Sequence, residues 1–187
     1  MRGASFCPTG KGRLRADHAG MLATAVNALM LQDCLVTGGI PTAVYSGLTV
    51  PDVIPGFNSD AARSDLDQGK VVILAGGTGN PLFTTDTAAA LRGIQLGVKL
   101  VLKATRVDGV YSADPETNAE AEFYAHLSYT EVLRRRLGVM DLCAVSLCME
   151  HDLPVRVFNY QDAGNIRKVL AGQAIGTLIG NKDHGSG

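Results

Sequence analysis

Three glycines stand between an apolar segment and a helix-forming segment in the stretch VVILAGGTGNPLFTTDTAAALRG, residues 71–93. Because they lack Cβ atoms, the glycines within residues 76–79 let the main chain adopt positive φ and bring its N–H groups close to a ligand. The small polar residues 84–86 then open a helix, whose unpaired N–H groups and dipole favour an anion. This order predicts a phosphate cradle at the end of a strand. The alternative is a tight loop with Thr85 or Asp86 as an ordinary N-cap, and the stretch matches neither a Walker A loop nor GxGxxG.

Charged residues elsewhere are candidates for acting on a transferring phosphoryl group. Lys103 ends the next predicted strand, where an ammonium group could neutralise developing charge, although strand-end lysines more often extend into solvent. Asp141 precedes an apolar helix and is either its N-cap or a carboxylate that faces the same cleft and holds a lysine or magnesium. The same two interpretations apply to Asp17, at the start of an earlier predicted helix.

Helical and strand-forming segments alternate along the chain, and the strands are β-branched runs without polar alternation. That pattern predicts an α/β fold, a three-layer αβα sandwich with a mainly parallel sheet. We expect a single domain over residues 1–187, with a frayed tail at 181–187. The predicted helices span 18–35, 60–68, 85–97, 128–138, 141–152 and 163–172, the predicted strands span 42–46, 71–75, 98–105, 154–159 and 176–180, and loops span 47–59 and 106–118.

The composition excludes several classes of protein. Apolar residues make up 46% of the 187 positions and the net charge is −1, so nothing favours binding to nucleic acid or to an anionic membrane surface. No uninterrupted apolar run reaches the roughly 18–20 residues of a membrane span, and the N-terminus lacks the apolar region of a secretory signal. The four cysteines form no CxxC pair, so we expect buried, reduced thiols in a cytoplasmic protein.

Several segments together resemble the bacterial uridylate (UMP) kinase family of the amino-acid-kinase superfamily. The resemblance runs from Arg2 to about Gly180. It is most specific in TGNPLFTTD (78–86) and KATRVDGVYSADP (103–115), and it continues through GVMDLCAV (138–145) and LPVRVFN (153–159). DHAGMLATAVNAL (17–29) resembles the subunit-contact helix of that family, and RGAS (2–5) resembles the segment after its first glycine loop.

The resemblance implies transfer of the γ-phosphoryl group of ATP to UMP, with magnesium, in pyrimidine nucleotide biosynthesis. It also implies a homohexamer that GTP activates and UTP inhibits. It implies that UMP is held by Asp17, Thr78, Gly79, Asn80, Pro81, Leu82, Phe83, Thr84 and Thr85. It further implies that ATP is held by Arg2, Thr105, Tyr111 and Asp114, with Tyr111 beside the adenine, and that Lys103, Asp86 and Asp141 surround the transferring group and its metal.

The sequence departs from the family at its start. Members begin with a strand bearing a K-L-S-G-E type motif, a helix and a second strand ending in a G-G-G-N loop, whereas Met1 stands where that loop has just ended. We therefore expect an N-terminally truncated chain with little or no kinase activity, whether as a fragment, a truncated gene product or a gene start assigned to an internal Met. The alternatives are a carbamate, glutamate or aspartate kinase, a remnant that binds nucleotide without turnover, or an unstable truncation.

Overall fold

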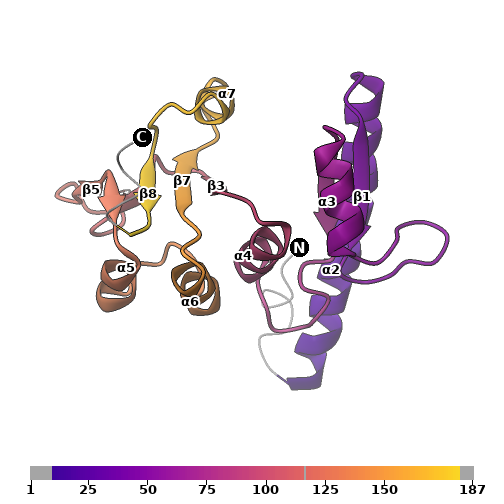
Figure 1. Cartoon of the computed structure of the whole chain (residues 1–187). Helices are drawn as coiled ribbons and strands as arrows, with labels where there is room; N and C mark the ends of the chain where they lie inside the picture. Colours follow the sequence, from indigo (N-terminus) through magenta and orange to yellow (C-terminus); the bar gives the residue numbers. More distant parts are fainter. Residues whose placement is uncertain (1–9, 116, 182–187) are drawn as a thin grey trace. The chain divides into compact units, whose positions relative to one another are not determined.

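The computed structural model describes residues 10–115 and 117–181, and the chain divides into two compact units, residues 1–88 and 89–187. The first unit contains α2 (Gly10–Thr37), β1 (Thr42–Ser46), α3 (Ser59–Asp67) and β2 (Val71–Ala75) (Figure 1). Helix α4 (Thr85–Leu96) begins in the first unit and ends in the second. The predicted strands 42–46 and 71–75 are therefore confirmed.

The first unit is organised around one parallel strand pair. β1 and β2 run in register from Thr42 opposite Val71 to Ser46 opposite Ala75, and both α2 and α3 pack on them. The core of this unit is small and made mainly of short side chains. Its buried members are Ala25, Ala28, Val44, Ile54 and Ala75.

Helix α2 is longer than its sequence pattern predicted. It already includes Gly10, so Asp17 lies inside the helix and its interpretation as an N-cap is wrong. The helix ends where predicted, because Gly39 adopts a φ of 78° and the Ile40 N–H donates to the Leu35 carbonyl at 2.9 Å. A glycine in the left-handed region is the usual way to satisfy the last carbonyls of a helix.

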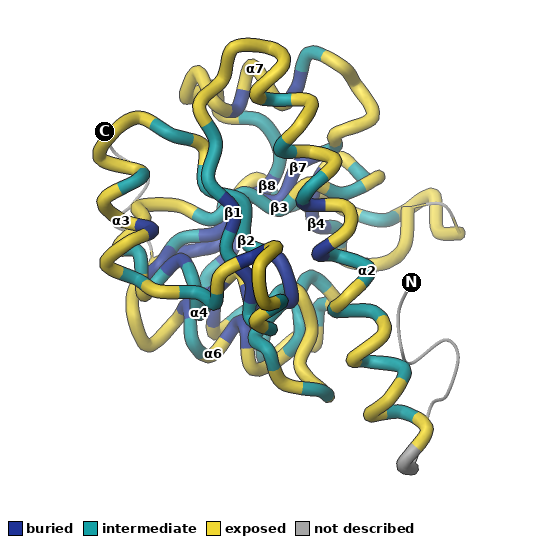
Figure 2. The backbone as a smooth tube through the Cα atoms, turned by 90° about the vertical axis from the view of Figure 1, so that its right-hand side faces the viewer, coloured by how far each residue is buried: buried dark blue, intermediate teal, exposed yellow. Residues whose placement is uncertain are grey.

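Much of α2 is apolar and yet exposed. Leu22, Val26 and Met30, spaced four residues apart, are 50%, 59% and 66% exposed, and Figure 2 shows little buried surface along this helix. Figure 1 shows that α2 continues well past the ends of the strands. By length and mean hydropathy (1.4) alone, the segment Gly12–Thr37 would suffice to cross a membrane. We did not predict this segment from the sequence, because we considered only uninterrupted apolar runs.

The second unit contains a four-stranded sheet in the order β3-β7-β8-β6. β3 pairs with β7 in parallel, and β6 with β8 in parallel, whereas β7 and β8 are antiparallel. The chain is thus an α/β protein, with one antiparallel neighbour in a sheet that we predicted to be mainly parallel. The elements are β3 (Val101–Thr105), β6 (His126–Leu127), α5 (Tyr129–Arg135), α6 (Leu142–Glu150), β7 (Val155–Asn159), α7 (Asn165–Leu170) and β8 (Thr177–Ile179).

Part of the segment predicted as a loop forms a small antiparallel pair. β4 (Val110–Tyr111) pairs with β5 (Phe123–Tyr124), a strand that the sequence pattern did not reveal because it is only two residues long. The Val110 N–H donates to the Thr177 hydroxyl at 2.8 Å, which joins this pair to β8. The hairpin therefore has a fixed position beside the sheet of the second unit.

The core of the second unit is larger than that of the first. Tyr129, Val132 and Val155 are buried in it, and the Tyr129 hydroxyl donates to the Leu153 carbonyl at 2.5 Å. Burial raises the pKa of Tyr129. The apolar residues Tyr129 and Val132 thus attach α5 to this core.

The cysteines only partly follow the predicted burial. Cys148 is buried, and burial raises the pKa of its thiol to about 11. Cys34 and Cys143 are exposed free thiols, so the prediction of burial is wrong for both. Cys143 is the second residue of α6 and points away from the face that packs, whereas Cys148 lies on that face. Cys7 lies outside the described residues.

Candidate functional site

The glycine loop after β2 packs directly against the chain that follows β1. Gly76, Gly77 and Gly79 adopt φ values of 70°, 57° and 82°, as their residue type predicted. A Cβ atom on Gly76 would lie 2.5 Å from the Ser46 hydroxyl, and one on Gly79 would collide with the main chain of Gly47. Two strand ends thus meet here, main chain against main chain.

Many amides of this loop are used by the protein itself. The Gly76 N–H donates to the Thr24 hydroxyl of α2 at 2.8 Å, and the Gly79 N–H donates to the Gly76 carbonyl at 2.9 Å. The Asn80 N–H donates to the Thr78 hydroxyl at 3.1 Å. We predicted that main-chain amides around residues 76–86 hold a ligand. The amides of Gly76, Gly79 and Asn80 instead donate hydrogen bonds within the protein and hold the loop.

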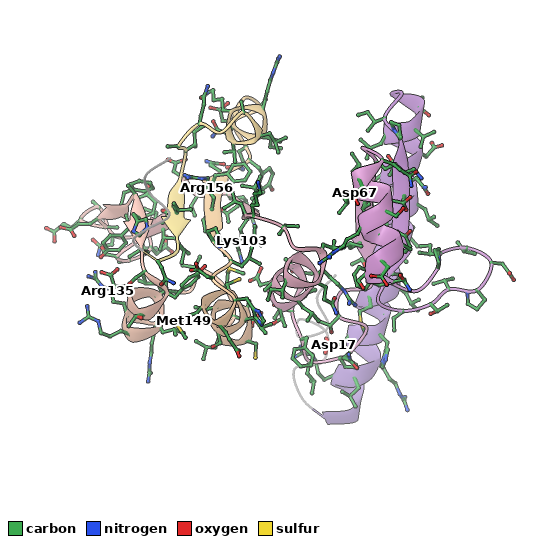
Figure 3. The ribbon with its side chains drawn as sticks, viewed as in Figure 1. Asp17, Asp67, Lys103, Arg135, Met149 and Arg156 are labelled. Carbon is green, nitrogen blue, oxygen red and sulfur yellow. The ribbon has the colours of Figure 1, made fainter. Side chains whose placement is uncertain are left out.

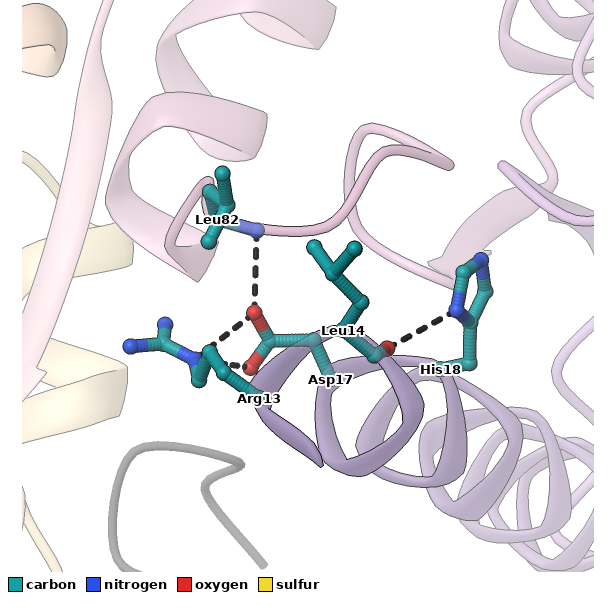
Figure 4. A network of polar contacts seen from close by, with 5 residues as sticks. All are labelled: Arg13, Leu14, Asp17, His18 and Leu82. Atoms are coloured by element: carbon teal, nitrogen blue, oxygen red, sulfur yellow. Dashed lines mark hydrogen bonds and ion pairs between the residues drawn. The ribbon is translucent and has the colours of Figure 1, made fainter. Parts of the chain in front are cut away.

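Asp17 fixes the far side of the loop. Its Oδ2 accepts the Leu82 N–H at 2.9 Å, and its carboxylate accepts the Arg13 Nε–H at 2.8 Å (Figure 4). The hydrogen bond from Arg13 holds the pKa of Asp17 below its ordinary value, and the Leu82 amide adds to that effect. An ionised carboxylate on α2 therefore anchors Leu82, which has a φ of 74° that a non-glycine side chain seldom adopts.

The helix start after the loop is capped by Thr84. Its hydroxyl accepts the Asp86 N–H at 3.0 Å, and its carbonyl accepts the Ala88 N–H at 3.1 Å. The N-cap is therefore Thr84, not Thr85 or Asp86, which are the first two residues of α4. Leu82, Phe83, Thr84 and Thr85 are all exposed, so this rim of the loop is open to a ligand.

The predicted acceptor residues thus come together in the first unit. Residues 78–85 form one partly exposed arch between β2 and α4, and the Asp17 carboxylate from α2 accepts the Leu82 N–H in it. Three threonine hydroxyls and the start of a helix give the arch the polar groups that suit a phosphate or a hydroxyl-rich ligand.

The second unit contains a separate pocket of about 470 Å³. Thr105, Tyr111 and Asp114 all line it, so three of the four residues predicted to hold ATP share one cavity, and Arg2 lies outside the described residues. Its apolar lining includes Val107, Val110, Ala113, Pro115, Leu137, Val139 and Val157. An apolar cleft with a few polar groups of this size suits a flat, drug-sized ligand such as a nucleoside.

Tyr111 and Thr105 are both held by neighbouring groups. The Tyr111 ring packs edge-to-face on Phe123 of β5, with ring centroids 5.3 Å apart. The Thr105 hydroxyl donates to the Val107 carbonyl at 2.8 Å at the end of β3. The pocket wall is therefore formed by strand ends and a hairpin that the tertiary structure fixes.

The three residues predicted to surround the transferring group lie in or at the start of three different elements, and their joint role stays a prediction. Lys103 lies in β3, opposite Val157 of β7 (Figure 3), and Asp141 caps α6 by accepting the Ala144 N–H at 2.9 Å. Asp86 lies in the first unit. The N-cap interpretation of Asp141 is confirmed.

A dedicated metal cage is absent from the described part of the chain. No group of three or more His, Cys, Asp or Glu side chains is placed to hold a metal ion within residues 10–115 and 117–181. Magnesium commonly takes one or two carboxylates together with substrate phosphates and water, so magnesium that arrives with a substrate does not require such a group.

Some residues around both surfaces were missed by sequence reasoning. Arg13 and Thr24 on α2 position Asp17 and Gly76, and Arg135 and Arg136 line the pocket of the second unit. The only local signal was the i, i+4 spacing of Arg13 and Asp17, which favours an ion pair on a helix.

Comparison with known proteins places these elements in a family. Residues 8–159 match the model of the amino acid kinase family. The chain is 49% identical over 178 residues to a uridylate kinase of Vibrio vulnificus, and the match covers 95% of this chain and 74% of that protein.

Solved structures give the same result. The chain superposes on a UMP kinase from Bacillus anthracis with a TM-score of 0.92 at 34% identity, covering 97% of this chain and 75% of that one. A UMP kinase from Ureaplasma parvum gives a TM-score of 0.87 at 31% identity, covering 95% and 75%. The chain spans about three-quarters of the length of these relatives. It therefore belongs to the amino acid kinase family, and within that family to the uridylate kinases.

Proposed function

We propose that this protein transfers the γ-phosphoryl group of ATP to UMP, giving UDP and ADP. A phosphate oxygen of UMP forms a bond to the γ-phosphorus as the bond to the β,γ-bridging oxygen breaks, and ADP leaves with that electron pair. Such a reaction requires little covalent chemistry from the protein, which must mainly position both substrates and neutralise charge. The observation that carries the proposal is the gathering of residues 78–85 and Asp17 into one partly exposed arch in a chain 49% identical to a uridylate kinase.

The arch of the first unit is proposed to hold UMP. The Asp17 carboxylate, already ionised by its partner Arg13, would keep Leu82 in place and present the threonines of the arch to the acceptor. The Asp17 carboxylate would repel the phosphate of UMP. The phosphate would therefore lie toward the start of α4, and the sugar or base toward Asp17.

The pocket of the second unit is proposed to hold ATP. Tyr111 would lie against the adenine, with Thr105 and Asp114 on the same wall. Lys103, Asp86 and Asp141 would surround the transferring group. Magnesium, when bound, would neutralise the phosphate charge, with Asp86 or Asp141 as its protein ligands.

We further propose the assembly and setting of the enzyme. Both units together would form one amino-acid-kinase domain, and the exposed stripe of Leu22, Val26 and Met30 on α2 would be covered by a second copy. The protein would act in the cytoplasm as a homo-oligomer, a hexamer, in pyrimidine nucleotide biosynthesis, with GTP as activator and UTP as inhibitor. Neither nucleic acid nor a membrane would be a partner.

A coupled assay of ADP release tests the proposed reaction. ATP would be offered with UMP, carbamate, glutamate or aspartate as the acceptor, and we expect any ADP release, even if slow, to require UMP. Asp17→Ala should weaken the binding of UMP about tenfold and leave the binding of ATP unchanged. Tyr111→Ala should weaken the binding of ATP about tenfold and leave the binding of UMP unchanged. Equal losses for both substrates in both variants would contradict the assignment of the two surfaces.

Titration calorimetry extends the test to a chain that turns over slowly. Binding of UMP and of ATP without ADP release would identify a nucleotide-binding protein instead of a kinase. For the assembly, light scattering should give a larger mass for the native chain than for Val26→Glu, with Glu150→Gln on the exposed surface of the second unit as the matched control.

A further inference from the structure

Arg136 lies at an unusual place in the fold. It is the C-cap of α5 and adopts φ 50° and ψ 42°, the left-handed region that strongly favours glycine. The turn lets the Leu137 N–H donate to the Val132 carbonyl at 3.1 Å, and Leu137 packs on the core. A glycine would make the same turn without strain, so the main chain alone gives no reason for an arginine here.

The Arg136 side chain faces a site that a ligand could use. Arg136 lines the pocket that also contains Tyr111 and Asp114, and it is exposed. Within the described residues, no hydrogen bond or ion pair engages its guanidinium group. The group is therefore available to a molecule in the pocket.

The neighbouring arginine shows what an engaged side chain looks like. The Arg135 guanidinium lies 5.2 Å from the centroid of the Tyr124 ring and donates to the Tyr124 hydroxyl at 2.7 Å. It also lies 3.8 Å from the Glu131 carboxylate. Arg135, which Figure 3 labels, is thus held as part of the pocket wall.

The lining of the pocket favours a flat ligand that a guanidinium group can cover. Aliphatic side chains and the Tyr111 ring form much of its wall, and Arg136 belongs to the segment after α5 that also lines it. Guanidinium groups are planar and stack on aromatic faces, which a lysine ammonium group cannot do in the same way.

We propose that Arg136 is a further binding residue for the donor nucleotide, and that its guanidinium group packs on the purine base in this pocket. The inference rests on the proposed function of the second unit as the ATP site. The strain of a left-handed arginine is then retained because the side chain contributes to affinity, as happens at other ligand sites.

Binding of the β,γ-imido analogue of ATP to the full chain, measured by titration calorimetry, tests this inference. We expect Arg136→Gln to raise the Kd about tenfold, equivalent to about 1.4 kcal/mol. Arg136→Lys should raise it similarly, because it keeps the charge but loses the planar group. Arg134→Gln, an exposed position on the same helix outside the pocket, is the matched control and should stay within about twofold of the native chain.

A fourth variant separates binding from folding. Arg136→Gly should weaken binding as Arg136→Gln does, while its Tm stays at or above that of the native chain, since glycine relieves the left-handed strain. A Kd for Arg136→Gln within about twofold of the native value would overturn the inference. A native Kd in Arg136→Lys would overturn the proposed contact with the base. A lower Tm for Arg136→Gly would show that the Arg136 side chain stabilises the fold, and would also overturn the inference.

The two proposals fail in distinguishable ways. Nucleotide binding that depends on Arg136 without UMP-dependent ADP release would leave the inference intact and overturn the proposed reaction. UMP-dependent turnover, together with nucleotide binding that is unchanged in the Arg136 variants, would support the proposed reaction and overturn the inference.

Discussion

The two units present their ligand-facing surfaces in different ways. In the first, the arch of residues 78–85 follows a loop that packs main chain against main chain, with Gly79 against Gly47, above a core that includes three alanines. In the second, the pocket is lined by side chains such as Tyr111 and Val157 beside a larger core. The loop that supports the first surface therefore tolerates no side chain at Gly79, whereas side chains themselves form the wall of the second surface.

Gly79→Ala should have the largest effect and tests the backbone packing of the first unit. The added Cβ would collide with the Gly47 main chain at a φ of 82°, so we expect the first unit to lose about 3 kcal/mol or more. Hydrogen exchange of the β1 and β2 amides measures this loss within the unit.

Gly69→Ala is the matched control for that substitution. Gly69 has a φ of 77°, but nothing lies within 4 Å of its missing Cβ, so only the backbone strain of about 1–2 kcal/mol applies. Equal losses for the two variants would show that the contact with Gly47 is unimportant.

Tyr129→Phe tests the buried core of the second unit. Tyr129 is 2% exposed, and removing its hydroxyl leaves the Leu153 carbonyl without that donor, at a cost of about 1–3 kcal/mol. Tyr45→Phe in the first unit is the comparison, because its partner Asp65 keeps a 2.7 Å contact with Lys70 and access to water. Denaturant unfolding should show a greater loss for Tyr129→Phe, and the reverse order would contradict the assigned difference between the cores.

Helix caps should have smaller, local effects in each unit. Ser128 and Glu131 form a reciprocal capping box on α5, and Asn58 caps α3 by accepting the Ala61 N–H at 2.9 Å. We expect Ser128→Ala and Asn58→Ala to cost about 1 kcal/mol each. Hydrogen exchange should locate each loss in its own unit, and a loss spread evenly over both would argue against two separate units.

The smallest effect should come from pH. The pKa of Asp17 is lowered from 3.8, so its contribution to stability is complete above that value and is lost as pH falls through the lower, folded pKa. The Leu82 amide, corrected for its intrinsic exchange rate, should therefore lose protection only in acid. Asp17→Asn should remove this dependence, and an unchanged pH profile in that variant would exclude Asp17 as its source.

Sequence patterns placed most elements correctly because hydrophobic periodicity and glycine stops are local signals. The strands 42–46 and 71–75 and the end of α2 before Gly39 followed directly. The two-residue strands β4 to β6 gave no usable pattern, and the antiparallel direction of β8 depends on where the chain returns, not on its composition.

The candidate site divides along the same line. The residue types at 76–86 determined that a glycine loop and a polar helix start follow a strand, because only glycine adopts those φ values without strain. The tertiary structure decided that Asp17 is within α2 and binds Leu82, that several loop amides are already used, and that Arg136 enters the pocket of Tyr111. Each of these contacts joins residues far apart in the chain or depends on the direction of one side chain, and such contacts exist only once the core has brought the elements together.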